Sequence, residues 1–351
     1  MQCCQWCAIF RSPLWTIAAP LFGKPLKKPL VPGLRGRFYC PTNRLIKISG
    51  EAVPAVPADV TPAYLAIDWG TTNRRIYVIA NDGTMLDTIR DDRGVLAMAA
   101  GEYPSEIAAI RDRLGDLPII AAGMVGSTRG WREAAYVPAP ADLATLAGAA
   151  TRIEEQRVTI VPGVSLLTDT RADVMRGEEV QVLGAIVAGL APADALFAQP
   201  GTHNKWVHTQ GGRIADFATT MTGELFALVK GHGILAGMLD GPVADGPAFR
   251  DGLSRGSGAC DLTAALFGVR ASVLLGRIAA EDAAAYASGL LIGNDIGAVP
   301  DMEGQTVYLL SGGLLADLYT IGIEQRGGRV VALDSHAGFL AGLHAIREHL
   351  S

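Results

Sequence analysis

The sequence predicts an α/β protein made of two related halves, and three glycine-containing turns support this prediction. Two of the turns, at residues 70–72 and 201–202, each lie between two short apolar runs that are typical of strands. The third turn, at residues 311–313, follows an apolar run and precedes a helical pattern. At 351 residues the chain is long enough for two domains of ordinary size.

The first turn lies inside a predicted hairpin. The run "YLAID" (64–68) reads as a buried strand, "RRIYVIA" (74–80) as a second strand, and an Asn-Asp-Gly turn leads to a third, "TMLDTI". A Walker loop or a dinucleotide fingerprint places its glycines before a helix, whose N-terminus meets the phosphate. Here backbone N–H groups and Thr hydroxyls would hold phosphate without a helix dipole. Asp68, at the end of the strand, would face Mg²⁺ through water.

The second turn repeats this order at 195–220. When Gly70 is aligned with Gly201, Thr71 falls on Thr202, Asn73 on Asn204 and Arg74 on Lys205. Lys205 is one of two lysines after residue 62, and a compact ammonium at this turn suits phosphate contact; a solvated surface lysine is the alternative. Two such hairpins indicate two related halves that present phosphate-binding turns to a shared cleft.

The third turn differs in kind, because the strand predicted in "TVYLLSGGLLADLY" (306–319) runs through Ser311-Gly312-Gly313 directly into a helix. Glycines at this place permit the close approach of a flat ligand, or a tight strand-to-helix turn. Packing of the backbone alone is the alternative explanation.

Together these pieces resemble the actin/hexokinase-like (ribonuclease H-like) superfamily, in which two similar α/β domains enclose ATP in a cleft between them. The motifs DWGTTNRR, GMVGS…GW, DVMRGEE, PGTHNKW and MTGELFAL, in this order, further resemble 2-dehydro-3-deoxygalactonokinases. The resemblance implies a phosphotransferase of galactonate catabolism that moves the γ-phosphoryl group of ATP to the 6-hydroxyl of 2-dehydro-3-deoxy-D-galactonate, with Mg²⁺. The chain departs from the family pattern at "EAAY" (133–136) and "GHGIL" (231–235).

The resemblance also implies a set of site residues. Those expected to bind ATP are Asp68, Gly70, Thr71, Thr72, Asn73, Gly201, Thr202, His203, Lys205, Ser311, Gly312 and Gly313, with Asp68 facing the metal. Those expected to bind the sugar acid are Gly123, Met124, Ser127, Arg129 and Trp131. The substrate carboxylate needs a donor, for which Arg129 is the candidate and Arg132 the alternative, although both could equally be solvated loop arginines.

Phosphoryl transfer also needs a carboxylate that orients the attacking hydroxyl and accepts its proton. Glu178, Asp173 and Glu179 are the candidates, all within "RADVMRGEEVQVLGA" (171–185). In carbohydrate-kinase relatives the base follows a glycine and precedes a small-residue helix, a pattern that Gly177-Glu178 matches. Those relatives use Asp, so Asp173 stays the alternative, and Glu178 could merely complement the helix dipole.

Composition and charge narrow the classes of partner. The chain is 49% hydrophobic and 19% charged, as in globular proteins, and no apolar run reaches the roughly 18 residues that a membrane helix needs. The part after residue 62 has a net charge of −11, which argues against nucleic acid binding. We therefore expect a small sugar acid as partner, and neither nucleic acid nor a membrane; the oligomeric state has no signature in the sequence.

The first 62 residues differ from the rest, with a net charge of +6, nine of the 19 prolines and four of the five cysteines. They show no helix or strand period and no secretory signal pattern. We expect a disordered extension or an over-called translation start, with a metal site at Cys4 and Cys7, near Cys3 and Cys40, as the weaker alternative. One cysteine, Cys260, among the other 289 residues favours a reducing cytoplasm.

The predicted organisation is an N-terminal extension over 1–62 and two kinase domains. The domain at 63–194 contains the first phosphate hairpin and the sugar-acid loop, and the domain at 195–351 contains the second phosphate hairpin and the adenosine turn. Two other functions stay open: a kinase of another sugar or sugar acid on the same fold, and a non-catalytic protein that binds ATP and sugar.

Overall fold

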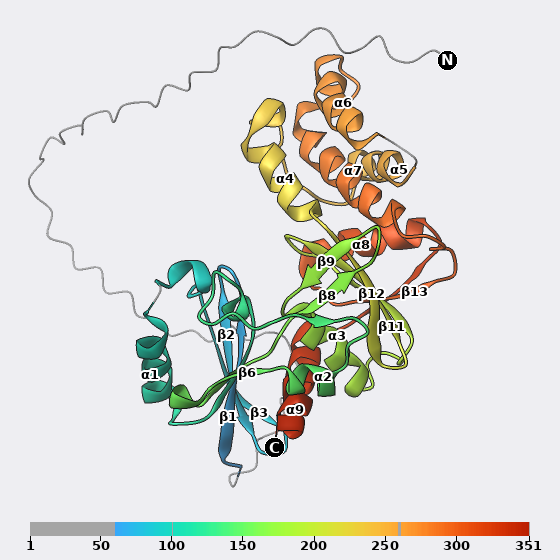
Figure 1. The fold of residues 1–351 in the computed structure, drawn as a ribbon. Coiled ribbons are helices and arrows are strands. Elements are labelled where there is room, and N and C mark those ends of the chain that lie inside the picture. The colour runs from blue at the N-terminus through green and yellow to red at the C-terminus, as the bar shows by residue number, and fades with distance from the viewer. Residues whose placement is uncertain (1–59, 100, 259–260, 351) are drawn as a thin grey trace, which may run out of the picture. The chain divides into compact units, whose positions relative to one another are not determined.

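The computed structural model describes residues 60–99, 101–258 and 261–350, whose strands form three sheets (Figure 1). The predicted N-terminal extension up to residue 59, its candidate metal site and Cys260 lie outside the described residues. Within the described part of the chain, no helix is both long and apolar enough to cross a bilayer.

The first sheet contains the first predicted hairpin. Its strands are β1 (Pro62–Trp69), β2 (Arg74–Ala80), β3 (Met85–Asp91), β4 (Ile119–Gly123), β6 (Thr151–Ile153) and β7 (Val158–Ile160), in the order β3-β2-β1-β4-β7-β6. β1, β2 and β3 pair antiparallel, and β4 lies parallel to β1 on its other side. Helix α1 (Tyr103–Leu114) packs its apolar face on this sheet through Tyr103, Ile107 and Ile110. The three predicted strands are confirmed.

The second sheet repeats this topology. Its strands are β10 (Ala195–Gln199), β11 (Asn204–Gln210), β12 (Arg213–Thr220), β13 (Thr306–Leu309) and β14 (Arg329–Ala332), in the order β12-β11-β10-β13-β14. Again three antiparallel strands are followed by a strand parallel to the first of them. The predicted α/β architecture of two related halves is therefore confirmed.

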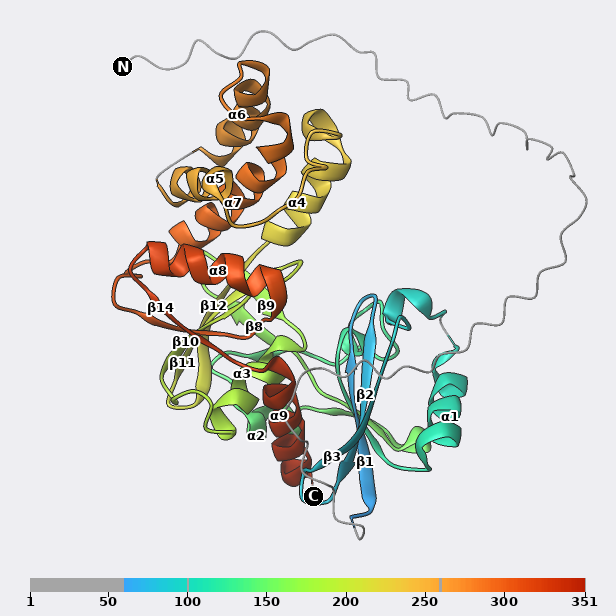
Figure 2. The ribbon, with the colours of Figure 1, turned by 180° about the vertical axis from the view of Figure 1, so that it is seen from behind.

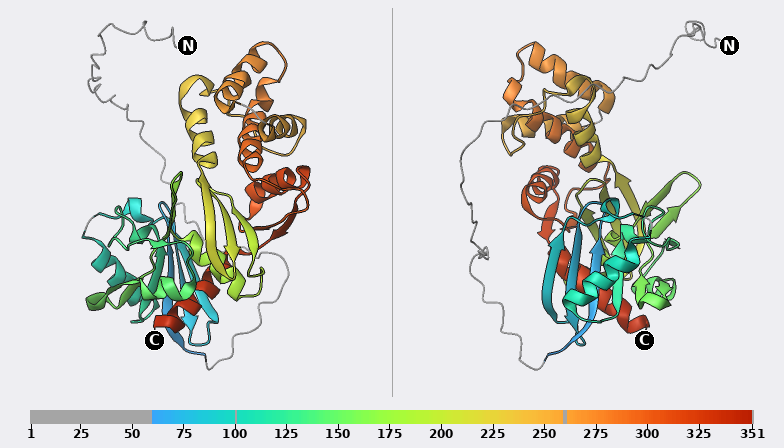
Figure 3. Two further views of the ribbon diagram at one scale, coloured as in Figure 1. Left: turned by 45° about the vertical axis from the view of Figure 1, so that its right-hand side comes forward. Right: turned by 90° about the vertical axis from the view of Figure 1, so that its left-hand side faces the viewer.

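The remaining elements connect and cover these sheets. The third sheet has β5 (Val137–Pro138), β8 (Val164–Leu167) and β9 (Ala172–Met175); the single-turn 3-10 helices are η1 (Val95–Ala97), η2 (Met124–Gly126), η3 (Glu154–Gln156), η4 (Gly233–Leu235) and η5 (Ala280–Asp282). Helices α4 (Thr222–Gly231), α5 (Pro247–Ser257), α6 (Leu262–Leu274) and α7 (Ala283–Gly297) form one group between β12 and β13 in the chain (Figure 3). Helix α8 (Gly313–Gln325) follows β13 and packs against β14 (Figure 2).

Helix α3 (Glu178–Val187) and the last helix, α9 (Ser335–Leu350), pack directly on each other, and α9 also contacts α2 (Leu143–Gly148) and β1 (Figure 2). A β-carbon added at Gly184 of α3 would lie 1.9 Å from the carbonyl oxygen of Gly338 in α9. The two backbones are thus close enough that only glycine fits at the crossing. Because α3 begins with Glu178, this contact helps to fix the predicted catalytic helix. The domain boundary after residue 194 stays a prediction.

We predict that Gly184→Ala destabilises the protein, because the added methyl group must push α3 and α9 apart. The free energy of unfolding should fall by about 1–3 kcal/mol, measured by urea denaturation. Gly148→Ala in α2 is the matched control, since no atom lies within 4 Å of the added carbon, and it should leave stability unchanged or slightly higher. Equal effects of the two substitutions would contradict the tight crossing.

Candidate active site

The first glycine turn is held from behind by the backbone of residues 94–96. The N–H group of Gly70 donates to the carbonyl of Asn73 at 3.0 Å, which closes the turn. The carbonyls of Gly70, Thr71 and Thr72 accept from the N–H groups of residues 95, 96 and 94 at 3.0, 3.1 and 3.2 Å. These carbonyl oxygens, which would repel a phosphate, are therefore already bonded within the protein.

A pocket of about 250 Å³ opens at this turn. It is lined by Asp68, Gly70, Thr71, Thr72, Asn73, Arg74, Arg75 and Arg90. The structure thus brings together all the residues predicted for the first phosphate turn. Arg75 was not predicted, yet it is the cross-strand partner of both Asp68 and Arg90. The hairpin register around residues 70–73 was the signal that could have identified it, because it places residue 75 opposite residue 68.

Asp68 is half-buried at the end of β1, and its pKa is raised to about 6. Burial is the main cause, since it disfavours the charged form; the negative charge of Glu178 adds to the rise, and Arg75 opposes it. A cation at Asp68 would reverse this rise. Among the described residues no group of three or more His, Cys, Asp or Glu is placed to hold a metal. A single carboxylate at the edge of a polar pocket is a donor that would suit Mg²⁺ whose other ligands are water and phosphate oxygens, and Asp68 stays the predicted metal ligand.

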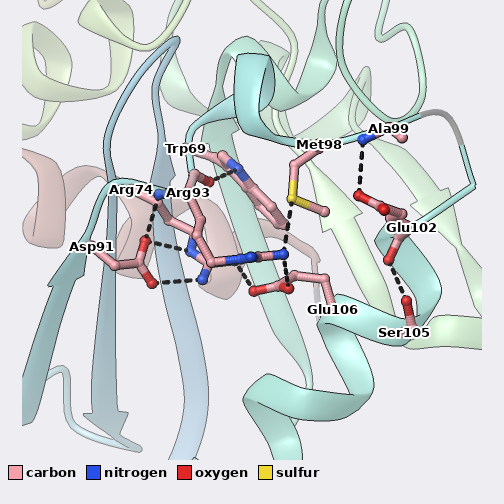
Figure 4. Close-up of polar contacts among 9 residues, drawn as sticks. All are labelled: Trp69, Arg74, Asp91, Arg93, Met98, Ala99, Glu102, Ser105 and Glu106. Carbon is pink, nitrogen blue, oxygen red and sulfur yellow. Dashed lines mark hydrogen bonds and ion pairs between the residues drawn. The ribbon is translucent and has the colours of Figure 1, made fainter. Parts of the chain in front are cut away.

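Arg74, which the alignment of the two hairpins paired with Lys205, has a different environment (Figure 4). Its buried guanidinium lies 2.6 Å from a carboxylate oxygen of Asp91 and 2.7 Å from one of Glu106, and it covers the ring of Trp69. Glu106 also pairs with Arg93 at 2.6 Å. Arg74 therefore ties β2 to β3 and α1 behind the turn, and its charge is already matched by two carboxylates.

The second turn, at residues 201–204, rests on a buried carboxylate that the sequence analysis missed. Asp295 of α7 accepts from the side chains of Asn204 at 2.6 Å, Trp206 at 3.0 Å and Thr220 at 2.9 Å. These bonds hold β11 and β12 against α7 directly below the turn. Asp295 is distant in sequence from the residues that it binds. The only sequence feature that could have drawn attention to it is that an acidic residue interrupts the apolar run "LLIGNDIGAV".

Helix α4 begins directly beside the second turn. The N–H group of Glu224 donates to the carbonyl of Thr202 at 2.9 Å, and the Glu224 carboxylate lies 2.6 Å from Nε2 of His203. A β-carbon at Gly223 would lie 2.3 Å from the carbonyl oxygen of Gly201. The expectation of a phosphate turn without a neighbouring helix N-terminus is therefore wrong for this half.

Lys205 and Glu178 meet where the second hairpin and α3 come together. The Lys205 Nζ atom lies 3.4 Å from Oε1 of Glu178, and the two side chains are 5% and 24% exposed. The other oxygen of Glu178 accepts from the N–H group of Arg176 at 3.0 Å. Lys205 is therefore a buried cation, so the alternative of a solvated surface lysine is wrong.

The two other candidate carboxylates are occupied by the protein. Glu179 is fully buried, and both of its oxygens accept from the N–H group of Gly177, at 2.8 and 2.7 Å. Its pKa is raised to about 8, first by burial and then by the charge of Glu178. Asp173 accepts from the N–H and hydroxyl groups of Thr219, each at 2.7 Å, which ties β9 to β12. Of the three, Glu178 is the one that keeps a partly exposed carboxylate without such bonds at both oxygens.

The predicted sugar-acid loop begins beside α3. A β-carbon at Gly177, whose φ of 105° requires glycine, would lie 3.2 Å from the α-carbon of Gly123. Ser127 shapes the loop, because its hydroxyl donates to the carbonyl of Met124 at 2.7 Å. The Trp131 ring stacks on Tyr103 of α1. Arg129 is exposed, as is its alternative, Arg132.

Helix α8, which follows the predicted adenosine turn, contributes Leu315 and Tyr319 to a second, mostly apolar pocket of about 100 Å³. Ser311, Gly312 and Gly313 are not among the lining residues. The pocket is lined by Gly201, Thr222, Gly223, Phe226, Ser288, Leu291, Ile292, Leu315 and Tyr319. Gly313 has a φ of 67°, and a β-carbon at Gly312 or Gly313 would meet no atom within 4 Å. Close packing therefore does not explain either glycine, but the positive φ of the strand-to-helix turn accounts for Gly313. A flat ligand at this turn stays a prediction.

A model of the 2-keto-3-deoxy-galactonokinase family matches residues 68–346. The chain belongs to this family. It is 40% identical to a probable 2-dehydro-3-deoxygalactonokinase of Rhizobium meliloti, over 80% of this chain and 95% of the relative. It is 34% identical to the 2-dehydro-3-deoxygalactonokinase of Escherichia coli, over 82% of this chain and 98% of that one. A crystal structure of a candidate member from Sinorhizobium meliloti superposes with a TM-score of 0.74, at 39% identity, covering 81% of this chain and 96% of the other.

The raised pKa of Asp68 predicts that this carboxylate destabilises the fold when it is charged. Its ordinary pKa is 3.8 and its folded pKa about 6, so stability should fall as the pH rises through this window. Asp68→Asn should therefore melt at a higher temperature than the parent protein at pH of about 7.5, with a smaller gain at pH of about 4.5. Asp112→Asn on the exposed face of α1 should show no such gain. A loss of stability in Asp68→Asn at neutral pH would contradict the burial argument.

Proposed function

We propose that this protein is an ATP-dependent kinase of 2-dehydro-3-deoxy-D-galactonate, which it converts to 2-dehydro-3-deoxy-6-phosphogalactonate in galactonate catabolism in the cytoplasm. The observation that carries the proposal is the contact of Lys205, from the second hairpin, with Glu178 at the start of α3. Asp68 of the first hairpin is close enough for the charge of Glu178 to raise its pKa. Family membership and the two relatives named above support the same substrate. We further propose that 63–194 and 195–351 act as separate domains.

In this proposal the two turns hold the phosphates of ATP. Thr71, Thr72 and Asn73 lie at the mouth of the first pocket, where Arg75 adds a positive charge beside Asp68. Thr202 and His203 belong to the second turn, and Lys205 reaches toward Glu178 from the strand that follows. Mg²⁺, when bound near Asp68, would neutralise phosphate charge. The apolar pocket between α4, α7 and α8 suits the adenine base.

Glu178 is the proposed general base. Its carboxylate would accept the proton of the 6-hydroxyl as the bond from that oxygen to the γ-phosphorus forms, while the bond from the γ-phosphorus to the bridging oxygen breaks and ADP leaves. The Lys205 ammonium lies 3.4 Å from Glu178 and in this proposal also faces the transferred group. Asp173 is the weaker candidate, because the bonds from Thr219 engage both of its oxygens.

An assay of ADP formation across a panel of sugars and 2-keto-3-deoxy acids tests the function and the base together. The parent protein should prefer 2-dehydro-3-deoxygalactonate, and Glu178→Gln should lower turnover roughly 10²–10⁴-fold with little change in ATP binding. Asp173→Asn is the control, which should reduce stability more than turnover. A parent protein that acts only on neutral sugars would refute the substrate, and an active Glu178→Gln with an inactive Asp173→Asn would transfer the role of base to Asp173.

Lys205→Met should weaken the binding of ATP more than that of the sugar acid, because the ammonium lies on the second phosphate hairpin. We expect the Kd of ATP, measured by calorimetry, to rise about 10-fold or more. Lys230→Met near the end of α4 is the matched control, since it is the other lysine after residue 62, and it should bind ATP as the parent does. Equal weakening of both ligands by Lys205→Met would show that the residue is structural.

A further inference from the structure

Arg176 is a buried cation whose charge the protein leaves largely unmatched. The residue is 9% exposed and directly precedes Gly177 and Glu178. One guanidinium nitrogen, Nη2, donates to the carbonyl of Ala134 at 2.8 Å. The other two, Nε and Nη1, have no hydrogen-bond partner among the described residues, and none of the ion pairs formed within 60–99, 101–258 and 261–350 includes Arg176.

Glu179 is the carboxylate most able to balance Arg176 from within the protein, yet it is engaged elsewhere. Both of its oxygens accept from the N–H group of Gly177. Burial and the charge of Glu178 raise its pKa to about 8, and the charge of Arg176 opposes this rise only in part. A buried guanidinium without an anion is strongly unfavourable. An acidic group from outside the chain that bonded to the unpaired donors of Arg176 would therefore be stabilising.

Arg176 lies between the candidate base and the sugar-acid loop. Its own N–H group donates to Glu178 at 3.0 Å. On the other side, a β-carbon at Gly126 of η2 would lie 2.8 Å from Nη1, so the loop touches the guanidinium. Arg176 and Glu178 are two residues apart in the segment that leads into α3. The guanidinium therefore lies in the same segment as the candidate base and against the loop predicted to bind the sugar acid.

The ring of Tyr136 covers the guanidinium of Arg176 at 4.3 Å and is itself 38% exposed. A rotation of this surface ring would open a path to the unpaired donors. The exposed Arg129 and Arg132 offer a weaker site, because an ion pair in water is screened and contributes little. A guanidinium in a site shielded from water binds a carboxylate through two parallel hydrogen bonds, with defined geometry.

We propose that Arg176 is the residue that recognises the carboxylate of the substrate, and that the Tyr136 ring moves aside to admit it. This inference rests on the proposed function, since it assigns the acidic end of the same substrate. In this proposal Arg176, and not Arg129 or Arg132, binds the substrate carboxylate. Arg176 is then the residue that distinguishes sugar acids from neutral sugars.

The test compares the sugar acid with its neutral carboxamide as acceptors. The parent protein should have a much higher kcat/KM for the acid. Arg176→Met should lose about 100-fold for the acid, little for the carboxamide, and nothing in ATP binding. Arg129→Met and Arg132→Met are the matched controls and should keep the preference for the acid. Arg176→Lys keeps the charge but loses the paired donors, so its preference should fall at least about 10-fold.

Three outcomes would overturn the assignment. The first is an equal loss of kcat/KM for acid and carboxamide in Arg176→Met. The second is a loss of the preference for the acid in Arg129→Met or Arg132→Met. The third is an unchanged preference in Arg176→Lys, the variant that tests the assignment if Arg176→Met does not fold. Failure of the proposed function can be distinguished from failure of the carboxylate site. A parent protein that prefers another sugar acid refutes the named substrate but not the carboxylate site, whereas one that accepts only neutral sugars refutes both.

Discussion

The contact between Lys205 and Glu178 is the interaction on which the proposed site depends. It joins the strand after the second turn to the first residue of α3, and so places the phosphate-binding half beside the candidate base. The elements that carry Lys205 and Glu178 are held in place by separate contacts. Asp295 holds β11 against α7 from below, while the close crossing with α9 holds α3 from behind. The ion pair therefore connects two elements that are each held in place by other contacts, so the positions of both side chains are fixed by the fold.

The site concentrates negative charge in a region of low dielectric constant. Burial raises the pKa of both Asp68 and Glu179, and the charge of Glu178 adds to the rise at each. Such an arrangement costs stability in the empty protein and is typical of sites that receive cations or transfer protons. In the proposed function, Mg²⁺ near Asp68 and phosphate near Lys205 would compensate this cost. Ligand binding should then be coupled to the protonation of Asp68 and Glu179.

Most of the fold was predictable from the sequence, because its signals are local. A glycine turn between two apolar runs predicts a hairpin, and both hairpins appear where the sequence places them. The same signals predicted the turn at 70–73, whose residues line the first pocket. A glycine before a helix predicted Glu178 as the base, and this role stays a prediction. The family resemblance added the sugar-acid loop and the order of the motifs.

The residues that escaped prediction act through distant partners. Asp295 is 91 residues from Asn204, and no pattern near either residue reveals the bond between them. Arg74 and Lys205 align in sequence, yet Arg74 is neutralised by Asp91 and Glu106 while Lys205 reaches the base. Arg176 belongs to the motif DVMRGEE, and only its burial and its unpaired nitrogens distinguish it from an ordinary surface arginine. Burial and pairing are properties of the folded chain, so sequence alone could not assign these roles.

The position of α9 has a consequence for biosynthesis. This helix is made long after α3, yet its Phe339 and Leu343 share a core with Val180 and Leu183 of α3. During translation α3 leaves the ribosome roughly 150 residues ahead of its partner, at about 5–20 residues per second. For many seconds the apolar side of α3 has no cover, and the nascent chain carries an exposed hydrophobic surface. The side chains of α3 that pack on α9 can be buried only after α9 has been made, so the start of α3 reaches its final support late in synthesis.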